Sequence, residues 1–194
     1  MNDSKSYRFL RPIINVFTKL IFRPNYIGIE NIPSDEKVIL AGTHTSVFDS
    51  ILLISCTKRS IHFLAKDELW KGFKKIIFSN MGLIPVNRKI KDHSSLKLAE
   101  DYLNNECVIG IFPEGTTEKE RGLLPFKIGA VKMASDTDSK IVPFAIIGKY
   151  RLFKRGLTII FDKPYKVKNK DLEMENTILR NKVIKLMEGK EYEK

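Results

Sequence analysis

The chain has 194 residues, of which 43% are hydrophobic, and its formal net charge is +11 at pH 7. This length suits one domain with a sizeable core, and no internal repeat or low-complexity tract interrupts it. The positive charge leaves an anionic membrane surface, a nucleic acid and an acidic substrate open as partners. The lysines are scattered and no motif for reading bases accompanies them, so we rank a membrane surface above a nucleic acid.

No stretch of the sequence is both long and uncharged enough to span a bilayer, and the N-terminus does not resemble a signal peptide. The two cysteines, Cys56 and Cys107, lie in apolar runs. We expect them to be small buried hydrophobic residues in a reducing compartment, not a disulfide framework.

The N-terminal segment combines apolar residues at helical spacing with five basic side chains against one acidic side chain in residues 1–23. Two interpretations stay open. Residues 1–24 form an amphipathic helix in a membrane interface, ahead of one domain over 25–194, or the helix packs on the core of that domain. Pro12 is expected in the first turn of this helix, where its missing N–H is tolerated.

Apolar runs with strand character alternate with helical patterns along the rest of the chain. The predicted strands are Tyr26–Glu30, Lys37–Gly42, Ile61–Ala65, Leu83–Asn87, Cys107–Phe112, Lys140–Ile146 and Leu157–Phe161. The predicted helices are one beginning near Asp49, then Asp67–Asn80, Asp92–Asn105, Lys127–Ser135 and Leu172–Met187. This order predicts an α/β fold, a single layered domain with a mixed, largely parallel central sheet flanked by helices. Pro85 places its strand at an edge or a strand end.

His44 and Asp49 stand at the junction between a predicted buried strand and a helix. A histidine can take a proton from a hydroxyl at neutral pH, and a carboxylate on its other ring nitrogen fixes the tautomer. Residues five apart lie about 140° apart on a helix, so the pair can meet only with His44 in the loop and Asp49 in the first turn. Ser46 and Asp49 also fit a capping box, so a purely structural role is open as well.

Further candidates stand at other predicted strand ends: Lys66, Arg88, Glu114, Gly115, Thr116 and the pair Val142-Pro143. Ligands gather at such ends in an open α/β sheet. Arg88 and Lys66 could hold a phosphate. Glu114 could accept from a substrate hydroxyl or tie its loop together, and Gly115 allows close backbone approach. Taken singly, each of these residues also has an ordinary structural explanation.

Together these stretches resemble the glycerolipid acyltransferases typified by 1-acylglycerol-3-phosphate O-acyltransferase. The motifs of that family are matched, in order, by His44 with Asp49, by residues 82–88, by residues 112–116 and by Val142-Pro143. The resemblance covers residues 26–165, and four motifs in the right order make it specific.

The resemblance implies transfer of a fatty acyl group from acyl-CoA or acyl-ACP to the free hydroxyl of 1-acylglycerol-3-phosphate, which forms phosphatidate. His44 would be the general base and Asp49 its orienting partner. The substrate-binding residues would be Lys66, Arg88, Glu114, Gly115 and Thr116. Backbone N–H groups around Gly115 would stabilise the oxyanion. No metal or cofactor is implied, and the enzyme would be peripheral, on the cytoplasmic face of the membrane.

Two residues depart from the family pattern. Thr43 stands where asparagine is usual, and Thr117 stands where arginine is common. If that arginine helps to hold the acceptor phosphate, then either Arg88 and Lys66 suffice or Arg121 or Lys127 substitutes. A different lysolipid acceptor is the rival explanation. A non-catalytic lipid-binding protein on the same fold is a second reading, and a nucleic-acid-binding protein, argued from charge alone, is a third.

Overall fold

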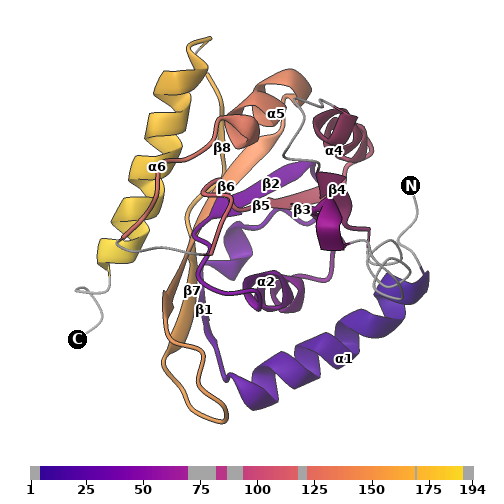
Figure 1. Cartoon of the computed structure of the whole chain (residues 1–194), viewed down its shortest axis with the longest axis vertical. Coiled ribbons are helices and arrows are strands. Elements are labelled where there is room, and N and C mark those ends of the chain that lie inside the picture. The colour runs from indigo at the N-terminus through magenta and orange to yellow at the C-terminus, as the bar shows by residue number, and fades with distance from the viewer. Residues whose placement is uncertain (1–4, 70–81, 87–93, 118–121, 169, 190–194) are drawn as a thin grey trace.

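Within the described residues, eight strands form one mixed sheet that carries helices on both faces (Figure 1). The computed structural model describes residues 5–69, 82–86, 94–117, 122–168 and 170–189. The strands are β1 Asn25–Ile27, β2 Val38–Gly42, β3 Ile61–Lys66, β4 Ile84–Val86, β5 Val108–Ile111, β6 Lys140–Gly148, β7 Leu157–Phe161 and β8 Tyr165–Lys166. The helices are α1 Lys5–Ile21, α2 Asp49–Cys56, α4 Ser94–Asn104, α5 Gly129–Thr137 and α6 Leu172–Glu188, with single 3₁₀ turns at Ile29–Asn31 and Asp67–Leu69.

The sheet runs in the order β1-β7-β6-β2-β5-β3-β4, and β8 also pairs with β6. Strands β6, β2, β5, β3 and β4 run parallel to one another, whereas β7 and β8 run antiparallel to β6, and β1 is parallel to β7. The predicted mixed, largely parallel sheet is therefore confirmed. Strand β4, which contains Pro85, lies at the edge, as predicted.

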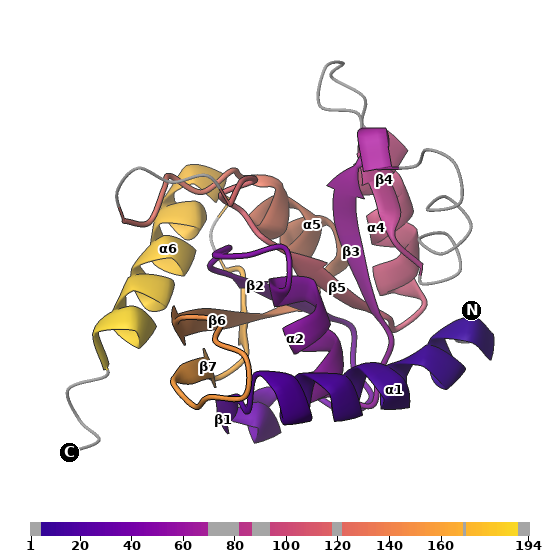
Figure 2. The same cartoon turned by 60° about the horizontal axis from the view of Figure 1, so that its bottom comes forward.

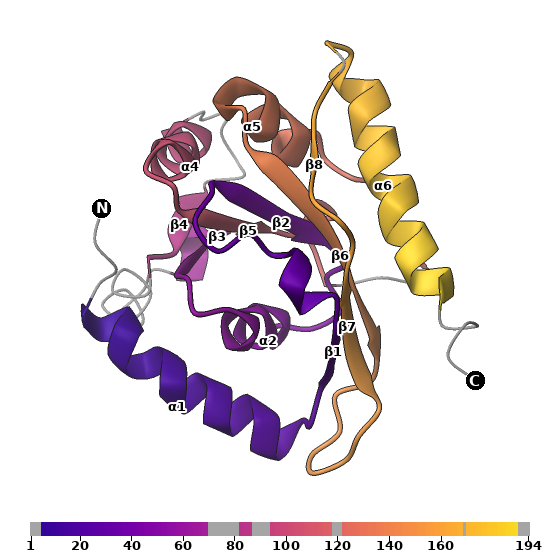
Figure 3. The ribbon, with the colours of Figure 1, turned by 180° about the vertical axis from the view of Figure 1, so that it is seen from behind.

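Strand β2 lies in the middle of the sheet, and its composition explains this position. Val38, Ile39, Leu40 and Ala41 are all fully buried. Val38 and Leu40 pack on the side of α1 and α2, whereas Ile39 and Ala41 pack on the side of α4, α5 and α6 (Figures 2 and 3). A strand covered on both faces needs an unbroken apolar run, and this one leads directly to His44.

Helix α1 packs one face on the core and leaves the other exposed. Tyr7 and Phe22 are buried in the cluster that also contains Val38. The opposite face carries five exposed apolar side chains, Phe9, Ile13, Val16, Phe17 and Leu20. We call these five residues the apolar face of α1. Packing of the helix on the core is thus confirmed for one face, and contact of the other face with a membrane stays a prediction.

The prediction that Pro12 occupies the first turn is wrong, because α1 begins at Lys5 and Pro12 lies inside it. Proline has no N–H to donate to the carbonyl one turn earlier, and the loss of this hydrogen bond usually ends or kinks a helix. Here the turns before Pro12 are held by tertiary contacts. The Tyr7 hydroxyl accepts from the Ile61 N–H at 3.0 Å, and Arg11 Nε donates to the Thr57 carbonyl at 2.6 Å.

Two strand predictions need correction. Strand β1 ends at Ile27 instead of Glu30, because Gly28 takes a left-handed conformation with φ 70° and starts a 3₁₀ turn. Pro143 lies inside β6, not at a strand end. Its missing N–H is tolerated because β8 pairs only with residues 140 and 141, and β7 only from Phe144 onward.

The remaining differences are small. Cys56 is buried and Cys107 only half-buried, and both are free thiols. Strand β8 was not predicted. Of the helix predicted over Asp67–Asn80, only the first turn falls among the described residues.

Candidate active site

His44, Glu114 and Lys66 lie on the same side of the sheet, because they follow or end parallel strands at their carboxyl ends. Ala41 of β2 is the register partner of Ile111 of β5, so His44 and Glu114 each stand three residues beyond a matched pair. Lys66 ends β3, the strand on the other side of β5. Arg88 follows β4 but lies outside the described residues.

His44 and Asp49 form the predicted pair. His44 Nδ1 is 2.9 Å from Asp49 Oδ2, and Asp49 is the first residue of α2. The carboxylate is fully buried, whereas the His44 side chain is 19% exposed. Because a carboxylate only accepts, Nδ1 carries the hydrogen and Nε2 is left to take up a proton. The ring stacks on Phe112, with centroids 4.0 Å apart, which fixes its plane.

Asp49 also organises the loop in front of α2. Its Oδ2 accepts from the backbone N–H groups of Thr45 at 2.5 Å and Ser46 at 2.9 Å, and its Oδ1 accepts from the Thr45 hydroxyl at 3.1 Å. The bond from the Ser46 N–H is one arm of the capping box that the sequence suggested. The structural and the catalytic explanations are therefore compatible, since one carboxylate serves both.

Tyr150 completes the surroundings of Asp49, and sequence reasoning missed it. Its hydroxyl donates to Asp49 Oδ1 at 2.5 Å from the segment after β6. Burial, then the charge of Asp49 and the hydrogen bond to it, raise the pKa of Tyr150, so this residue stays a neutral donor. Its ring packs edge-on against Phe22 at 5.1 Å and lies 5.8 Å from Phe48. Phe22, the residue after α1, is thus linked to the His44–Asp49 pair through Tyr150.

Glu114 is buried and ties two loops to the site. Its Oε1 accepts from the His44 N–H at 2.9 Å and its Oε2 from the Leu124 N–H at 3.0 Å. These bonds favour the loop-tying role that the sequence left open, because both carboxylate oxygens have protein donors. A direct contact between Glu114 and substrate stays a prediction.

Gly115 allows a cation to lie against the turn that follows β5. Its φ of 72° is left-handed, and a Cβ at this position would meet Lys127 Nζ at 2.9 Å. Lys127 is thus one of the two proposed substitutes for the arginine that Thr117 replaces; the other, Arg121, lies outside the described residues. The Gly115 N–H donates to the Phe112 carbonyl at 2.9 Å and is engaged within the turn. Stabilisation of the oxyanion by the backbone N–H groups around Gly115 stays a prediction.

The other departure from the family pattern has a structural role. Thr43 is buried, and its hydroxyl accepts from the Ile146 N–H of β6 at 2.8 Å. This bond continues the pairing of β2 with β6 beyond Gly42 and holds the backbone that leads to His44. His62, by contrast, has structural contacts: its ring stacks on Tyr102 at 4.0 Å, and its Nδ1 lies 2.9 Å from the Gly82 carbonyl.

Comparisons with known proteins identify the family of this chain. A sequence model of the family described as "Acyltransferase" matches residues 23–147. The 1-acyl-sn-glycerol-3-phosphate acyltransferase of Borreliella burgdorferi is 31% identical over 177 residues, which cover 83% of this chain and 70% of that protein. The Bacillus subtilis protein of the same name is 33% identical over 168 residues, which cover 81% of each.

The fold has a solved counterpart. The crystal structure of the 1-acyl-sn-glycerophosphate acyltransferase of Thermotoga maritima matches with a TM-score of 0.77 and 21% identity, over 100% of this chain and 84% of that one. At this identity the likeness supports the fold alone, but the family model and the two relatives are more specific. This chain belongs to the acyltransferase family.

Proposed function

We propose that the protein transfers a fatty acyl group from acyl-CoA or acyl-ACP to the free hydroxyl of 1-acylglycerol-3-phosphate and so makes phosphatidate. The observation that carries the proposal is the His44–Asp49 pair, held at 2.9 Å at the edge of the sheet in a member of the acyltransferase family. The names of the two bacterial relatives support this acceptor.

The chemistry needs a base and no enzyme nucleophile. The acceptor oxygen attacks the thioester carbonyl carbon as His44 Nε2 takes its proton. Asp49 holds the opposite ring nitrogen and stabilises the imidazolium that forms, as in a Ser-His-Asp triad whose nucleophile is the substrate hydroxyl. The tetrahedral intermediate then expels the thiolate, the C–S bond breaks, and His44 returns the proton to sulfur. Within the described residues, no group of three or more His, Cys, Asp or Glu side chains is placed to hold a metal ion.

The test is acyl transfer by the purified protein from a labelled long-chain acyl thioester, offered on CoA and on ACP. The acceptors are lysophosphatidate, lysophosphatidylcholine and monoacylglycerol. The proposal expects turnover with lysophosphatidate to exceed turnover with the other two. If the enzyme prefers another lysolipid, that lysolipid is the acceptor instead of lysophosphatidate. If neither donor supports transfer to any acceptor, the result favours a non-catalytic lipid-binding protein.

Arg88 is expected to bind the acceptor phosphate, with Lys66 and Lys127 as further candidates. Charge-assisted hydrogen bonds contribute about 1.5–3 kcal/mol, so Arg88→Ala should raise KM for lysophosphatidate by about 10- to 100-fold and leave monoacylglycerol unaffected. Lys127→Ala under the same conditions shows whether this lysine, beside Gly115, substitutes for the arginine missing at Thr117. An Arg88→Ala enzyme with wild-type affinity for lysophosphatidate would rule out this role.

We also propose that the protein attaches to the cytoplasmic face of the membrane through α1. No helix in the described part of the chain has both the length and the apolar composition needed to cross a bilayer. The apolar face of α1 is 47–70% exposed. Val47 and Phe48, between the two catalytic residues, are also exposed. Phe48 lies 5.4 Å from the buried Phe22, which in turn lies 6.2 Å from Phe17, so one buried ring links Phe48 to the apolar face of α1. An amphiphilic acceptor would enter from such a surface.

The protein is expected to float with vesicles containing anionic lipid and to be released by salt. Phe17→Ser with Leu20→Ser should weaken this binding at least about tenfold, because both side chains would lose their contact with the apolar layer. The matched control is Met174→Ser with Met187→Ser, two exposed apolar residues on α6, across the sheet from α1. Two results would contradict this orientation. In one, the protein fails to float with the vesicles at low salt. In the other, both pairs of substitutions weaken vesicle binding equally.

A further inference from the structure

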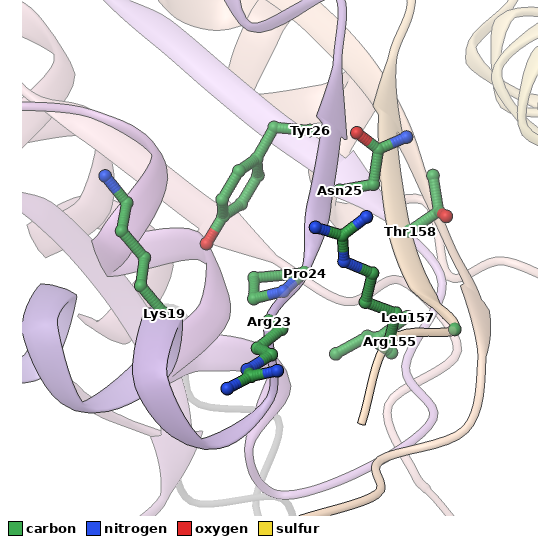
Figure 4. Close-up of a pocket in the computed structure, with 9 residues that line it drawn as sticks. Lys19, Arg23, Pro24, Asn25, Tyr26, Arg155, Leu157 and Thr158 are labelled. Carbon is green, nitrogen blue, oxygen red and sulfur yellow. The ribbon is translucent and has the colours of Figure 1, made fainter. Parts of the chain in front are cut away.

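A second positively charged site lies away from the catalytic pair. A cavity of about 690 Å³ opens between the end of α1, the start of β1 and the start of β7 (Figure 4). Lys19 and Arg23 line it from the α1 side, and Arg155 lines it from the turn before β7. Of the described residues, those that line the cavity include no acidic residue and none of the site residues named above. Its volume lies within the range of small-ligand sites.

Among the residues that the structure describes, the three cations have no acidic partner. Other lysines form ion pairs, for example Lys140 with Glu36 at 2.6 Å and Lys166 with Asp138 at 2.6 Å. Lys19, Arg23 and Arg155, however, make no hydrogen bond or ion pair with any residue that the structure describes. Three uncompensated charges around one cavity attract an anion.

Arg23 holds its place at a conformational cost. Its φ is 44°, in the left-handed region that helix ends usually assign to glycine. At this φ the backbone of arginine is strained, whereas the backbone of glycine would not be. The presence of arginine therefore points to a use for its side chain. Positive charge near a helix C-terminus is favourable and partly accounts for Lys19 and Arg23. It does not account for Arg155, which belongs to a different segment.

The cavity adjoins the surface that we assign to the membrane. Lys19 is next to Leu20 of the apolar face of α1. On the other side of the cavity, the turn before β7 exposes Leu152 and Phe153. The Phe153 N–H donates to the Ile21 carbonyl at 2.5 Å, which joins this turn to the end of α1. A protein attached through these apolar residues would hold the cavity at the level of the lipid headgroups.

We propose that this cavity binds a phosphate group, which in the attached protein is the headgroup phosphate of an anionic phospholipid that does not react. Arginine pairs with phosphate oxygens through two N–H groups at once, and lysine adds a point charge. Asn25 and Thr158, which also line the cavity, supply polar groups for a headgroup. The choice of a lipid rests on the membrane attachment proposed above, whereas the phosphate site itself does not.

The experiment compares two variants of equal charge. The cavity pair is Arg23→Gln with Arg155→Gln. The control pair is Arg151→Gln with Lys154→Gln, which are exposed on the same turn but do not line the cavity. Binding of inorganic phosphate and of soluble dibutanoyl phosphatidylglycerol is measured at constant ionic strength. Partition onto phosphatidylcholine vesicles with and without phosphatidylglycerol is then measured. These arms need no acyl donor, so they are independent of whether the protein transfers acyl groups.

Wild type is expected to bind the soluble probes saturably, and the cavity pair to lose at least about tenfold in affinity while the control pair does not. Partition onto anionic vesicles should fall about fivefold for each cation removed from the cavity and less for the control. Saturable binding of both probes supports a general phosphate site, and binding of the lipid probe alone supports a headgroup site. No saturable binding of either probe by wild type, or equal losses for the two pairs, overturns the proposal.

Arg23→Gly separates binding from folding. Glycine removes the strain at φ 44°, so the denaturation midpoint should rise while phosphate binding weakens. If Arg23 served only to end the helix, the glycine variant would keep full phosphate binding, and that result also overturns the proposal.

Discussion

Replacing His44 by alanine is expected to lower kcat for acyl transfer on the order of 10³- to 10⁴-fold, the contribution of a positioned general base. The fold should survive, because four other donor groups still reach Asp49: the Thr45 and Ser46 N–H groups and the Thr45 and Tyr150 hydroxyls. The stack on Phe112 is lost, at a cost of about 1 kcal/mol in the free energy of unfolding. Single-turnover acyl transfer and thermal unfolding, measured on one preparation, check both statements.

His62→Gln is the matched control. This histidine stacks on Tyr102 and lies away from the sheet edge where the site forms. We expect the control to lose stability and to keep kcat within a few-fold of wild type, which is the opposite pattern to His44→Ala. Product formation by His44→Ala within tenfold of wild type would mean that His44 is not the base, and the capping interpretation of its loop would then stand alone.

The sequence predicted how His44 and Asp49 meet, but it did not predict every residue that holds them in place. Five-residue spacing excluded a contact within one helix, so His44 had to precede the helix and Asp49 had to begin it, as the structure shows. Local chemistry decided this geometry. Tyr150 lies 101 residues from Asp49, and no pattern around it indicates a role at the site. It reaches Asp49 only because β6 lies beside β2 and extends beyond it to Gly148.

The same distinction explains the errors. Pro143 looked like the end of a strand because proline removes a ladder donor. In the structure, neither β7 nor β8 pairs with β6 at Pro143, so the missing N–H has no strand partner to lose. That register is set by segments more than ten residues away in the sequence. Pro12 looked like a first-turn residue, and the contacts of Tyr7 with Ile61 override that preference. Local patterns thus predicted most elements and the contact between His44 and Asp49, whereas pairing between distant segments decided which other residues contact them.

Asp49→Asn should lower kcat by about 10²- to 10⁴-fold and keep the fold. Its amide oxygen can take the position of Oδ2 and accept from His44 Nδ1 and the two backbone N–H groups, which cannot turn away. The amide nitrogen then faces the Thr45 and Tyr150 hydroxyls, which can rotate to accept from it. We expect a loss of about 1–3 kcal/mol in the free energy of unfolding. The negative charge that stabilises the imidazolium is gone, so the chemical step suffers most.

Tyr150→Phe tests how much the hydrogen bond from Tyr150 to Asp49 contributes to kcat, because the substitution removes this donor and leaves the charge of Asp49. We expect kcat to fall about tenfold, from the loss of one hydrogen bond to a charged group. Tyr165→Phe is its control: that hydroxyl is buried and has no hydrogen-bond partner among the described residues, so its removal should be neutral or stabilising. In the Asp49→Asn background, Tyr150→Phe should have almost no further effect on kcat, because Tyr150 acts on the reaction through the carboxylate. Independent, additive losses would show that Tyr150 acts elsewhere, through the rings of Phe22 and Phe48 that it joins to the site.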